Sequence, residues 1–191
     1  MTQGLDFTAP SQVLARDLIG ANLTLNGVGG PIVETEAYDI TDPASHSFAG
    51  PTSRNAVMFG PVGRVYVYRI YGLHLCLNIV CGPQVGGAVL IRALLPTKGI
   101  EAMAERRGIG KLEALCSGPG RLCQALGVTM AHNGLPIDQA PFGLTPALEV
   151  PIIAVGPRIG ITKAVDEPWR FGLAGSRYLS KAFKASEPKG P

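Results

Sequence analysis

The sequence feature that most constrains the fold is the segment RVYVYRIYGLHLCLNI (residues 64–79), where two strand-like runs meet at Tyr71 and Gly72. β-Branched and aromatic residues favour strands, and a glycine between two such runs indicates a hairpin. A two-residue loop would place Tyr71 at a position of a type I′ turn that prefers Asn or Gly. We therefore expect a three-residue loop, 70–72, formed by a type I turn with Gly72 in the left-handed region.

The expected loop sets the strand register, which pairs Arg69 with Leu73 and Val67 with Leu75. Successive strand residues point to opposite faces, so one face of the hairpin is aliphatic and typical of a core. The opposite face resembles the wall of a ligand pocket, because it carries Tyr66, Tyr68, His74, Cys76 and Asn78. At the tip, the Tyr71 ring either packs back on a neighbouring loop or inserts into a partner such as a base stack.

Two carboxylates lie on another predicted strand, PIVETEAYDI (residues 31–40). The strand period of two places Glu34, Glu36 and Tyr38 on one face. The simplest interpretation is a strand with one solvated face. Only 16% of the residues are charged, however, so two like charges on one face need a reason.

The chain has 191 residues, 46% of them apolar, which suits one domain with a substantial core. Its segments predict an α+β fold over residues 1–191: a curved, mostly antiparallel sheet with a protruding β-hairpin and flanking helices. The expected helices are 11–20 with Ser11 as N-cap, one near 97–107 and one near 117–127, and the expected strands include 22–25, 64–69, 73–80 and 86–94. Residues 41–63 read as a long irregular loop, which is usually functional or disordered.

Composition and charge disfavour several classes of protein. No apolar run approaches the roughly 20 residues of a membrane span, and the N-terminus does not resemble a secretory signal. The four cysteines form no CxxC pair, which argues against zinc and favours a reduced, cytoplasmic location. A net charge of +3 is compatible with nucleic acid binding without requiring it. We expect residues 177–191 to form a flexible basic tail with Arg177, Lys181, Lys184 and Lys189.

Seven groups of residues together resemble the alkyladenine (3-methyladenine) DNA glycosylases, which are monofunctional enzymes of base-excision repair. They are IVETEAY (32–38), DPASHS (42–47), RN with MFGP (54–61), VYVYRIYGLHLCLNIV (65–80), VLIRALLP (89–96), LCSGPGRLCQALGV (115–128) and RFGLAGS (170–176). They occur in the order found in that family and cover most of the chain. Each segment alone is a weak signal, and their combination is specific.

The resemblance implies that the partner is double-stranded DNA with damaged purines, on which the protein acts as a monomer at the nucleoid. A glycosidic bond inside a base stack is unreachable, so the damaged base has to be flipped out of the duplex. Tyr71 matches the family's intercalating tyrosine, which fills the gap left by the base, and Leu73 beside it supports this wedge.

The resemblance also implies a pocket for the flipped base. The base is expected to lie between aromatic side chains at Tyr38, His46 and Tyr68, and such stacking tolerates many bases. Asn78 matches the residue that disfavours guanine through its exocyclic amine, which is selection by an adverse contact.

Catalysis in the resembling family needs a water and a carboxylate. Glu36 matches the glutamate that deprotonates the water for attack on C1′ of the deoxyribose and stabilises the developing positive charge. Arg92 and the backbone carbonyl of Leu173 match the groups that hold this water, with no metal and no cofactor. Glu34 is then a structural or solvated neighbour. The lysines fall outside the matched pocket segments, which predicts no Schiff-base intermediate and no lyase activity.

Contacts to the DNA backbone are expected at Arg54 and at Arg121, where Ser117 would cap a helix whose N-terminus faces phosphate. An ordinary capped helix with a solvated arginine fits Arg121 equally well. Two other functions remain open: a damaged-DNA binding protein without catalytic activity on the same scaffold, and a hydrolase of free nucleosides that uses the same glutamate.

Overall fold

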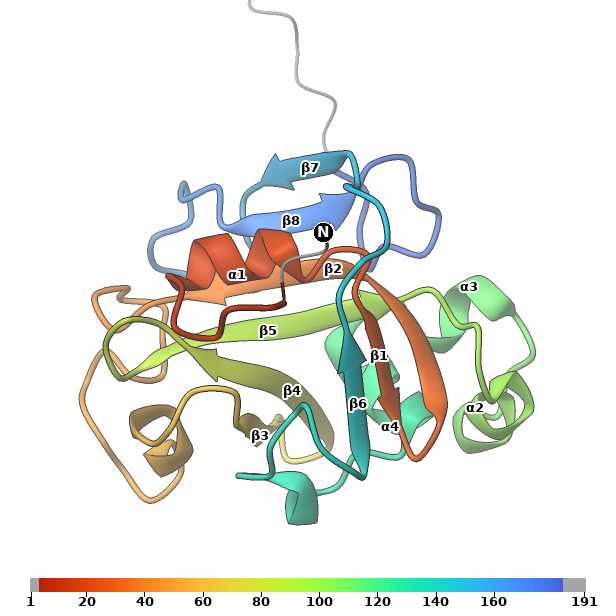
Figure 1. Cartoon of the computed structure of the whole chain (residues 1–191), viewed down its shortest axis with the longest axis horizontal. Coiled ribbons are helices and arrows are strands. Elements are labelled where there is room, and N and C mark those ends of the chain that lie inside the picture. The colour runs from red at the N-terminus through yellow and green to blue at the C-terminus, as the bar shows by residue number, and fades with distance from the viewer. Residues whose placement is uncertain (1–3, 184–191) are drawn as a thin grey trace, which may run out of the picture.

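The computed structural model describes residues 4–183 as one α+β domain with a curved antiparallel sheet (Figure 1). Its α-helices are α1 (Ser11–Asp17), α2 (Ile100–Arg107), α3 (Leu112–Leu115) and α4 (Pro119–Leu126). Its strands are β1 (Asn22–Leu25), β2 (Val28–Tyr38), β3 (Val65–Ile70), β4 (His74–Cys81), β5 (Gly87–Leu94), β6 (Phe142–Thr145), β7 (Ile153–Gly156) and β8 (Arg170–Leu173). The expected fold class is therefore confirmed.

The sheet is organised around the long strand β2. The order of the main path is β3-β4-β5-β2-β1-β6, while β8 pairs with β2 and β7 pairs with β8. All of these pairings are antiparallel. The later half of β2 lies between β5 and β8, with Leu90 and Arg170 opposite Glu36. The glutamate pair therefore lies in the interior of the sheet and away from any solvated edge.

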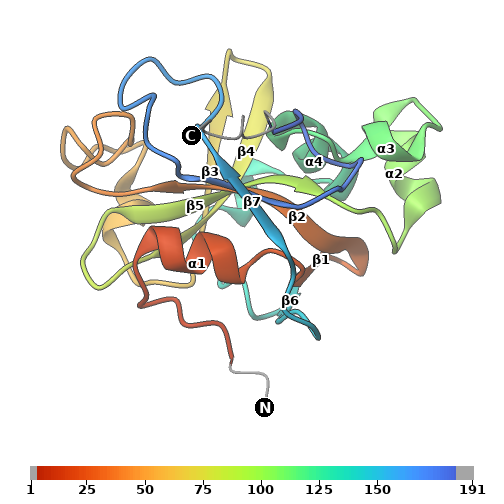
Figure 2. The same ribbon diagram turned by 90° about the horizontal axis from the view of Figure 1, so that it is seen from above.

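The two faces of β2 divide as the period of two predicts. Thr35 faces α1, and its hydroxyl donates a hydrogen bond to the Ala15 carbonyl at 2.8 Å. Helix α1 packs across β2 and β5, and α4 packs against β4 and β5 (Figure 2). The apolar residues between these elements form one continuous core, which leaves the opposite face of β2, with Glu36 and Tyr38, for the site.

The β3–β4 hairpin projects from the sheet, between α4 and the loop after β7 (Figure 2). Its faces are as expected, because Tyr66 pairs with Asn78 and Tyr68 pairs with Cys76. The expected pairing was wrong by two residues: Arg69 lies opposite Leu75 and not opposite Leu73. An even shift keeps every side chain on its face, so the pocket wall survives the error.

The tip of the hairpin has an unexpected backbone conformation. Both Tyr71 (φ 51°) and Gly72 (φ 70°) lie in the left-handed region, and the Leu73 amide donates to the Ile70 carbonyl at 3.2 Å. The expected type I turn with Gly72 alone in this region was therefore wrong. Tyr71 occupies a position that usually favours Asn or Gly, which costs an estimated 1–2 kcal/mol at a non-glycine residue. Such strain often marks a functional position.

The loop 41–63 is held in place by its own side chains. Asn55 is buried, and its amide nitrogen donates to the carbonyls of His46 (2.7 Å) and Gly50 (3.1 Å). Its oxygen accepts from the Thr52 amide. Because Asn55 bridges distant points of the loop, the polypeptide around His46 has a defined position beside the hairpin.

The ends of the helices differ from expectation at three places. Pro10 occupies the N-cap position of α1, and Gly118 occupies that of α4, so the expected caps at Ser11 and Ser117 were wrong. The expected helix near 97–107 begins at Ile100 and ends at the left-handed Gly108. Within residues 4–183, no helix is long and apolar enough to cross a membrane.

Candidate active site

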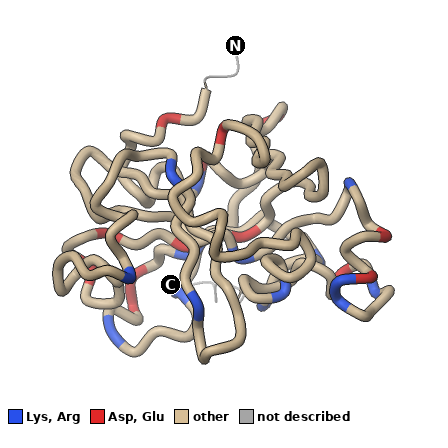
Figure 3. The backbone as a smooth tube through the Cα atoms, turned by 90° about the horizontal axis from the view of Figure 1, so that it is seen from below, with Lys and Arg blue, Asp and Glu red and all other residues tan. Residues whose placement is uncertain are grey.

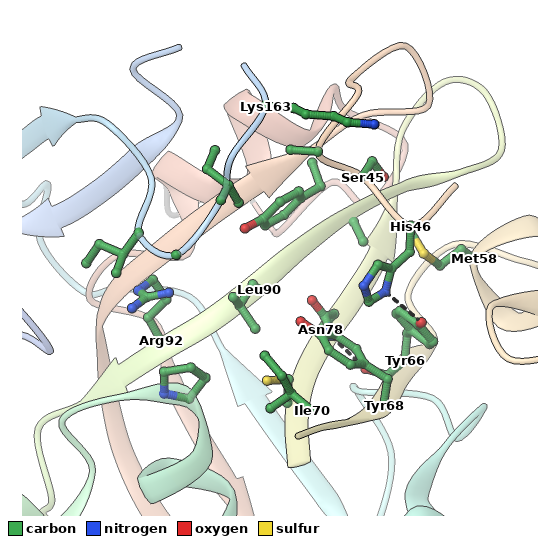
Figure 4. A pocket seen from close by; sticks show the side chains of 18 of the residues that line it. Ser45, His46, Met58, Tyr66, Tyr68, Ile70, Asn78, Leu90, Arg92 and Lys163 are labelled. Carbon is green, nitrogen blue, oxygen red and sulfur yellow. Dashed lines mark hydrogen bonds between the residues drawn. The ribbon is translucent and has the colours of Figure 1, made fainter. Parts of the chain in front are cut away.

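A pocket of about 540 Å³ opens between the hairpin, the loop 41–63 and the loop after β7 (Figure 4). It brings together the predicted residues Tyr38, His46, Arg54, Tyr68, Tyr71, Asn78 and Arg92. These residues come from five separate segments of the chain, so the pocket exists only in the folded sheet. Its volume lies in the usual range for sites that bind small organic molecules.

An aromatic group forms one wall of the pocket. The rings of His46 and Tyr68 meet edge to face, with their centroids 4.5 Å apart, and Tyr66 lies behind them. His46 Nδ1 lies 3.0 Å from the Tyr66 hydroxyl, as the dashed line in Figure 4 shows. Burial and the nearby Arg54 lower the pKa of His46, so the imidazole is neutral at pH 7. This wall therefore offers flat, uncharged surfaces to a ligand.

Asn78 lies among these rings on β4. Its amide nitrogen donates to the Tyr66 carbonyl at 3.0 Å, which fixes the orientation of the side chain. Asn78 is buried, yet it lines the pocket. A ligand therefore meets an amide that cannot turn freely.

The Glu36 carboxylate lies fully buried directly beneath the pocket lining. Its Oε1 atom accepts a hydrogen bond from the Ile159 amide at 2.7 Å. Its Oε2 atom accepts from the Tyr38 hydroxyl at 2.9 Å and lies 3.2 Å from Arg92 Nη1. Tyr38, Arg92 and Ile159 all line the pocket, so Glu36 is one layer below the surface that a ligand touches.

Burial sets the protonation behaviour of this carboxylate. Desolvation raises the pKa of Glu36 above its usual range, while Arg92, the Ile159 amide and Tyr38 partly offset this effect. Burial and the neighbouring Glu36 also raise the pKa of Tyr38, which keeps the phenol protonated and donating. A carboxylate with a raised pKa and a fixed set of donors is typical of a general base.

Glu34 lies in a separate set of contacts, which we call the Glu34 cluster: Glu34, Arg92, Arg170 and Ser180. Glu34 Oε1 accepts from Arg92 Nε (3.0 Å), Arg170 Nε (2.7 Å) and the Ser180 hydroxyl (2.8 Å). Its other oxygen accepts from the Ser180 amide. The carboxylate is fully buried, so the solvated alternative for Glu34 was wrong, as was the solvated strand face.

Arg92 joins the two carboxylates, because its Nε atom contacts Glu34 and its Nη1 atom contacts Glu36. Its Nη2 atom donates to the Ser180 hydroxyl at 3.2 Å. Burial alone would lower the pKa of Arg92, but the two carboxylates raise it, so the guanidinium stays charged. The side chain therefore has a fixed position at the edge of the pocket (Figure 4).

The structure does not bring Leu173 to Glu36. Strand β8 pairs with β2 so that Arg170 lies opposite Glu36 and Gly172 lies opposite Glu34, which carries Leu173 past both glutamates. The Leu173 carbonyl accepts from the Ser176 amide at 3.1 Å, and the residue does not line the pocket. The Glu36 carboxylate is contacted instead by the loop 158–163, through the Ile159 amide.

Sequence reasoning missed the loop 158–163, which we call the closing loop. Ile159, Gly160, Ile161, Thr162 and Lys163 all line the pocket. Lys163 lies outside the segments that were matched in the sequence, and the structure nevertheless places it in the pocket lining. The available signal was Arg158, a single charge in the otherwise apolar stretch IIAVGPRIGI.

The rim of the pocket is formed by the hairpin tip and Arg54. Tyr71 and Leu73 are 84% and 80% exposed, so neither packs back on a neighbouring loop. Arg54 donates to the Arg69 carbonyl at 2.9 Å and lies over the Tyr68 ring. Apolar side chains at a protruding tip, beside a charged rim, are typical of a surface that inserts into a partner.

A second hollow of about 500 Å³ adjoins the pocket at Arg92, Pro119 and Ile159. Among residues 4–183, no carboxylate lines this hollow, and its lining includes the basic residues His74, Arg92, Arg107, Arg121 and Lys181. Basic and acidic positions are spread over the backbone, and several of both signs gather around α2 and α3 (Figure 3). Arg121 donates to the carbonyl and hydroxyl of Ser117 and remains exposed. The hollow therefore suits an anionic ligand beside the pocket.

The cysteines lie in the interior of the fold. All four cysteines are free and buried, and Cys76 also lines the pocket. Across residues 4–183, no three His, Cys, Asp or Glu residues are grouped as a metal site would require.

Comparison with known proteins identifies the family of the chain. The model of the methylpurine-DNA glycosylase (MPG) family matches residues 5–177. The chain belongs to that family. A relative from Nitrosospira multiformis is 60% identical over 181 residues, which cover 94% of each chain. Relatives from Rhodopseudomonas palustris strain HaA2 (60% over 172 residues, 90% of this chain and 86% of the relative) and Rhizobium etli (59% over 178 residues, 93% and 88%) are similar. All three are named "Putative 3-methyladenine DNA glycosylase".

The segment that follows residue 177 lies beyond the match to the glycosylase family but belongs to the site. Ser180 binds Glu34, and the Phe183 ring packs 3.9 Å from the Arg170 guanidinium. Arg177 pairs with Glu113 at 3.1 Å. Residues 177–183 thus pack against the domain, whereas Lys184 and Lys189 of the expected tail lie outside the described residues.

Proposed function

We propose that this member of the methylpurine-DNA glycosylase family is a monofunctional DNA glycosylase for alkylated and deaminated purines. Its substrates would include 3-methyladenine, 7-methylguanine, hypoxanthine and ethenoadenine, and its product would be an abasic site. The observation that carries the proposal is a buried carboxylate with a raised pKa beneath an aromatic pocket, beside an exposed aromatic tip.

Base flipping in this proposal divides between the tip and the pocket. Tyr71 and Leu73 project from the hairpin without burial in the protein, so their apolar surface is free to replace a base in the stack. The flipped base would lie against Tyr38, His46 and Tyr68. Stacking on aromatic side chains contributes about 1–3 kcal/mol per base and discriminates little between bases, which suits several lesions.

Selection against normal guanine would come from Asn78. Because its amide already donates to the Tyr66 carbonyl, the side chain has a fixed orientation at the pocket wall. The exocyclic amine of guanine would meet this fixed side chain in an adverse contact, which selects against guanine. Asn78→Ala is therefore expected to increase excision of guanine derivatives relative to hypoxanthine.

The hydrolytic step needs a water that reaches both Glu36 and C1′ of the sugar. Arg92 lines the pocket and the basic hollow, and its guanidinium contacts Glu36. A water held between Arg92 and Glu36 would lie where the two cavities meet. Glu36 would take its proton as the glycosidic bond breaks, and its negative charge would stabilise the oxocarbenium-like sugar.

DNA strands would follow the basic groups on the two sides of the pocket. Arg121 and Lys181 line the hollow on one side, and Arg54 lies at the rim of the pocket. Each is well placed to contact a phosphate of a duplex whose damaged base has entered the pocket. Phosphate contacts carry no sequence information, in keeping with an enzyme that acts on damage in any sequence.

A lysine in a glycosylase pocket can attack C1′ and form a Schiff base. Because Lys163 lines the pocket, the expected absence of lyase activity needs a test. Figure 4 shows the Lys163 side chain at the pocket edge, directed away from Arg92. We propose that hydrolysis is the only route. Borohydride reduction during turnover should trap no covalent protein–DNA complex.

The test is incubation with duplexes that carry one hypoxanthine or one 1,N6-ethenoadenine, followed by alkali. Strand breaks only after alkali are expected for the wild-type protein, and none for Glu36→Gln, which should still bind the damaged duplex. Binding without any breaks for every purine lesion would favour the non-catalytic binding protein. Release of bases from free nucleosides, with Tyr71→Ala unaffected, would favour the nucleoside hydrolase.

A further inference from the structure

Arg158, at the start of the closing loop, is fully buried at its guanidinium and lies outside the pocket lining. Two of its nitrogens bind the Asp42 carboxylate, which is itself buried. Nη1 also donates to the Ala37 carbonyl at 3.0 Å. A buried ion pair with additional hydrogen bonds holds its members in one geometry, because any displacement leaves charge without a partner.

The same guanidinium lies between two aromatic rings. Its central carbon is 4.7 Å from the centroid of Tyr38 and 5.1 Å from the centroid of Trp169. Tyr38 lines the pocket and Arg158 does not, so Arg158 packs behind the ring that would meet the base. A planar cation stacked on a ring restricts its tilt and displacement.

Arg158 also acts on Glu36 through the next residue in the chain. The Ile159 amide donates to Glu36 Oε1 at 2.7 Å, and the Arg158 side chain bonds to the carbonyl of Ala37, between Glu36 and Tyr38. Because the side chain is fixed to β2, the backbone that follows it is held against the same strand. One residue therefore fixes both neighbours of Ala37.

We propose that Arg158 is a positioning residue of the reaction, which holds the Ile159 amide on Glu36 and the Tyr38 ring against the flipped base. This inference rests on the proposed glycosylase function. Arg158 itself touches neither the base nor the water. Arg158 acts through the Ile159 amide and the Tyr38 ring. Asp42 compensates the charge of the Arg158 guanidinium, which is not exposed to the pocket.

A lysine cannot replace this arginine. It would retain the positive charge and could contact Asp42, but it lacks the planar fork that binds Asp42 and Ala37 together and stacks between two rings. Arg158→Lys therefore keeps the positive charge but removes the contacts that position the Ile159 amide and the Tyr38 ring. Arg106→Lys is the matched control, because Arg106 also bonds a carbonyl (Ala125, 2.9 Å) but is exposed and lies outside both cavities.

The expected readout is the acidic limb of the pH profile for hypoxanthine excision, measured in single turnover. The groups that face Glu36 are Arg92 on β5, Glu34 and Tyr38 on β2, Tyr68 on β3, Cys76 on β4 and the Ile159 amide. Of these, Arg158→Lys disturbs the Ile159 amide and Tyr38, which both lower the pKa of Glu36. The limb should therefore move to higher pH by about one unit, the size of one hydrogen bond to a charged group.

The rate at the plateau should fall by about tenfold or more, as displaced catalytic groups do, while Arg106→Lys leaves the limb and the plateau unchanged. A merely structural role would lower the melting temperature and the active fraction without moving the limb, and that result would overturn the inference.

Should Arg158→Lys not fold, Trp169→Leu, which removes one of the two rings beside the guanidinium, is expected to move the limb in the same direction. An unmoved limb in Trp169→Leu would then overturn it. A wild-type protein that excises nothing would refute the proposed function itself, a distinct outcome.

Discussion

On β2 only Thr35 lies between Glu34, in the Glu34 cluster, and Glu36, at the pocket end of the strand. The two regions use buried carboxylates in opposite ways. Glu34 accepts from two guanidinium groups and from the amide and hydroxyl of Ser180, so its oxygens have all their partners within the protein. Glu36 accepts hydrogen bonds from one phenol and one amide and forms an ion pair with one guanidinium nitrogen, and each of these groups belongs to a residue that lines the pocket.

The difference is what would be expected of a strand that supplies both a structural carboxylate and the proposed general base. Charge at Glu34 is compensated twice, by Arg92 and Arg170, which favours a fixed carboxylate. Charge at Glu36 is compensated by the shared Arg92 alone, and burial raises its pKa, which favours a carboxylate that can accept a proton. The comparison predicts that substitutions at the Glu34 cluster change stability, and that those at the pocket and its rim change chemistry or DNA binding.

The largest effect is expected for Glu34→Gln. This change leaves Arg170 without its buried counter-charge and leaves Arg92 with Glu36 alone. Breaking a buried ion pair from one side costs about 3–5 kcal/mol of unfolding free energy. Urea denaturation should show this loss, and excision per folded molecule should fall much less than in Glu36→Gln. Unchanged stability would remove the distinction between the two carboxylates.

The next effect is expected at the rim. Tyr71→Ala removes the ring that would replace the flipped base, and loss of one such stacking partner costs about 1–3 kcal/mol of binding. Affinity for a hypoxanthine duplex and the single-turnover rate should both drop, with no loss of melting temperature because the ring is exposed. Tyr71→Phe keeps the ring and should behave as the wild type. A large stability change in Tyr71→Ala would place the tip with the scaffold.

A smaller effect of opposite sign is expected for the stability of Glu36→Gln. Because the pKa of Glu36 is raised in the folded state, the protonated form stabilises the fold below the unfolded-state pKa. That contribution is lost as pH rises through the folded-state pKa. At pH 7.5 the neutral glutamine should therefore give a higher melting temperature than the wild type, and the difference should vanish in acid. A lower melting temperature at pH 7.5 would assign Glu36 to the scaffold.

The smallest effect is expected for Arg121→Ala in the basic hollow. Its guanidinium is exposed and bonds only Ser117 among the residues that the structure describes. Removing one phosphate contact should weaken damaged and undamaged duplex binding alike and lower the slope of log affinity against log salt by about one. Fluorescence anisotropy at several salt concentrations measures this slope. An unchanged slope would leave Arg121 as an ordinary solvated side chain.

Local sequence patterns predicted the parts of the site that depend on strand period. The faces of β2 and of the hairpin follow from alternation, so Glu36 shares a face with Tyr38, and Tyr68 shares a face with Asn78. The turn at Tyr71 was placed incorrectly because a tyrosine in the left-handed region contradicts the residue preference on which such predictions depend.

The partners of the carboxylates could not be predicted from these patterns. Glu34 meets Arg170 and Ser180, and Glu36 meets the Ile159 amide, across more than 120 residues of intervening chain. Such contacts depend on how β8 and the closing loop return to β2, which no local preference specifies. Arg158 was missed for the same reason, since its role becomes visible only when Asp42 and two rings surround it.

The late position of the closing loop in the chain has a consequence for synthesis. A ribosome that has made the first 150 residues has already produced the β3–β4 hairpin, the aromatic wall and both glutamates. It has not yet produced Ile159, which donates to Glu36, or Arg170 and Ser180, which donate to Glu34. A nascent chain of this length therefore has the hairpin that is proposed to contact DNA but lacks the amide that contacts Glu36. In this order of translation, the proposed excision of bases depends on residues that are made last.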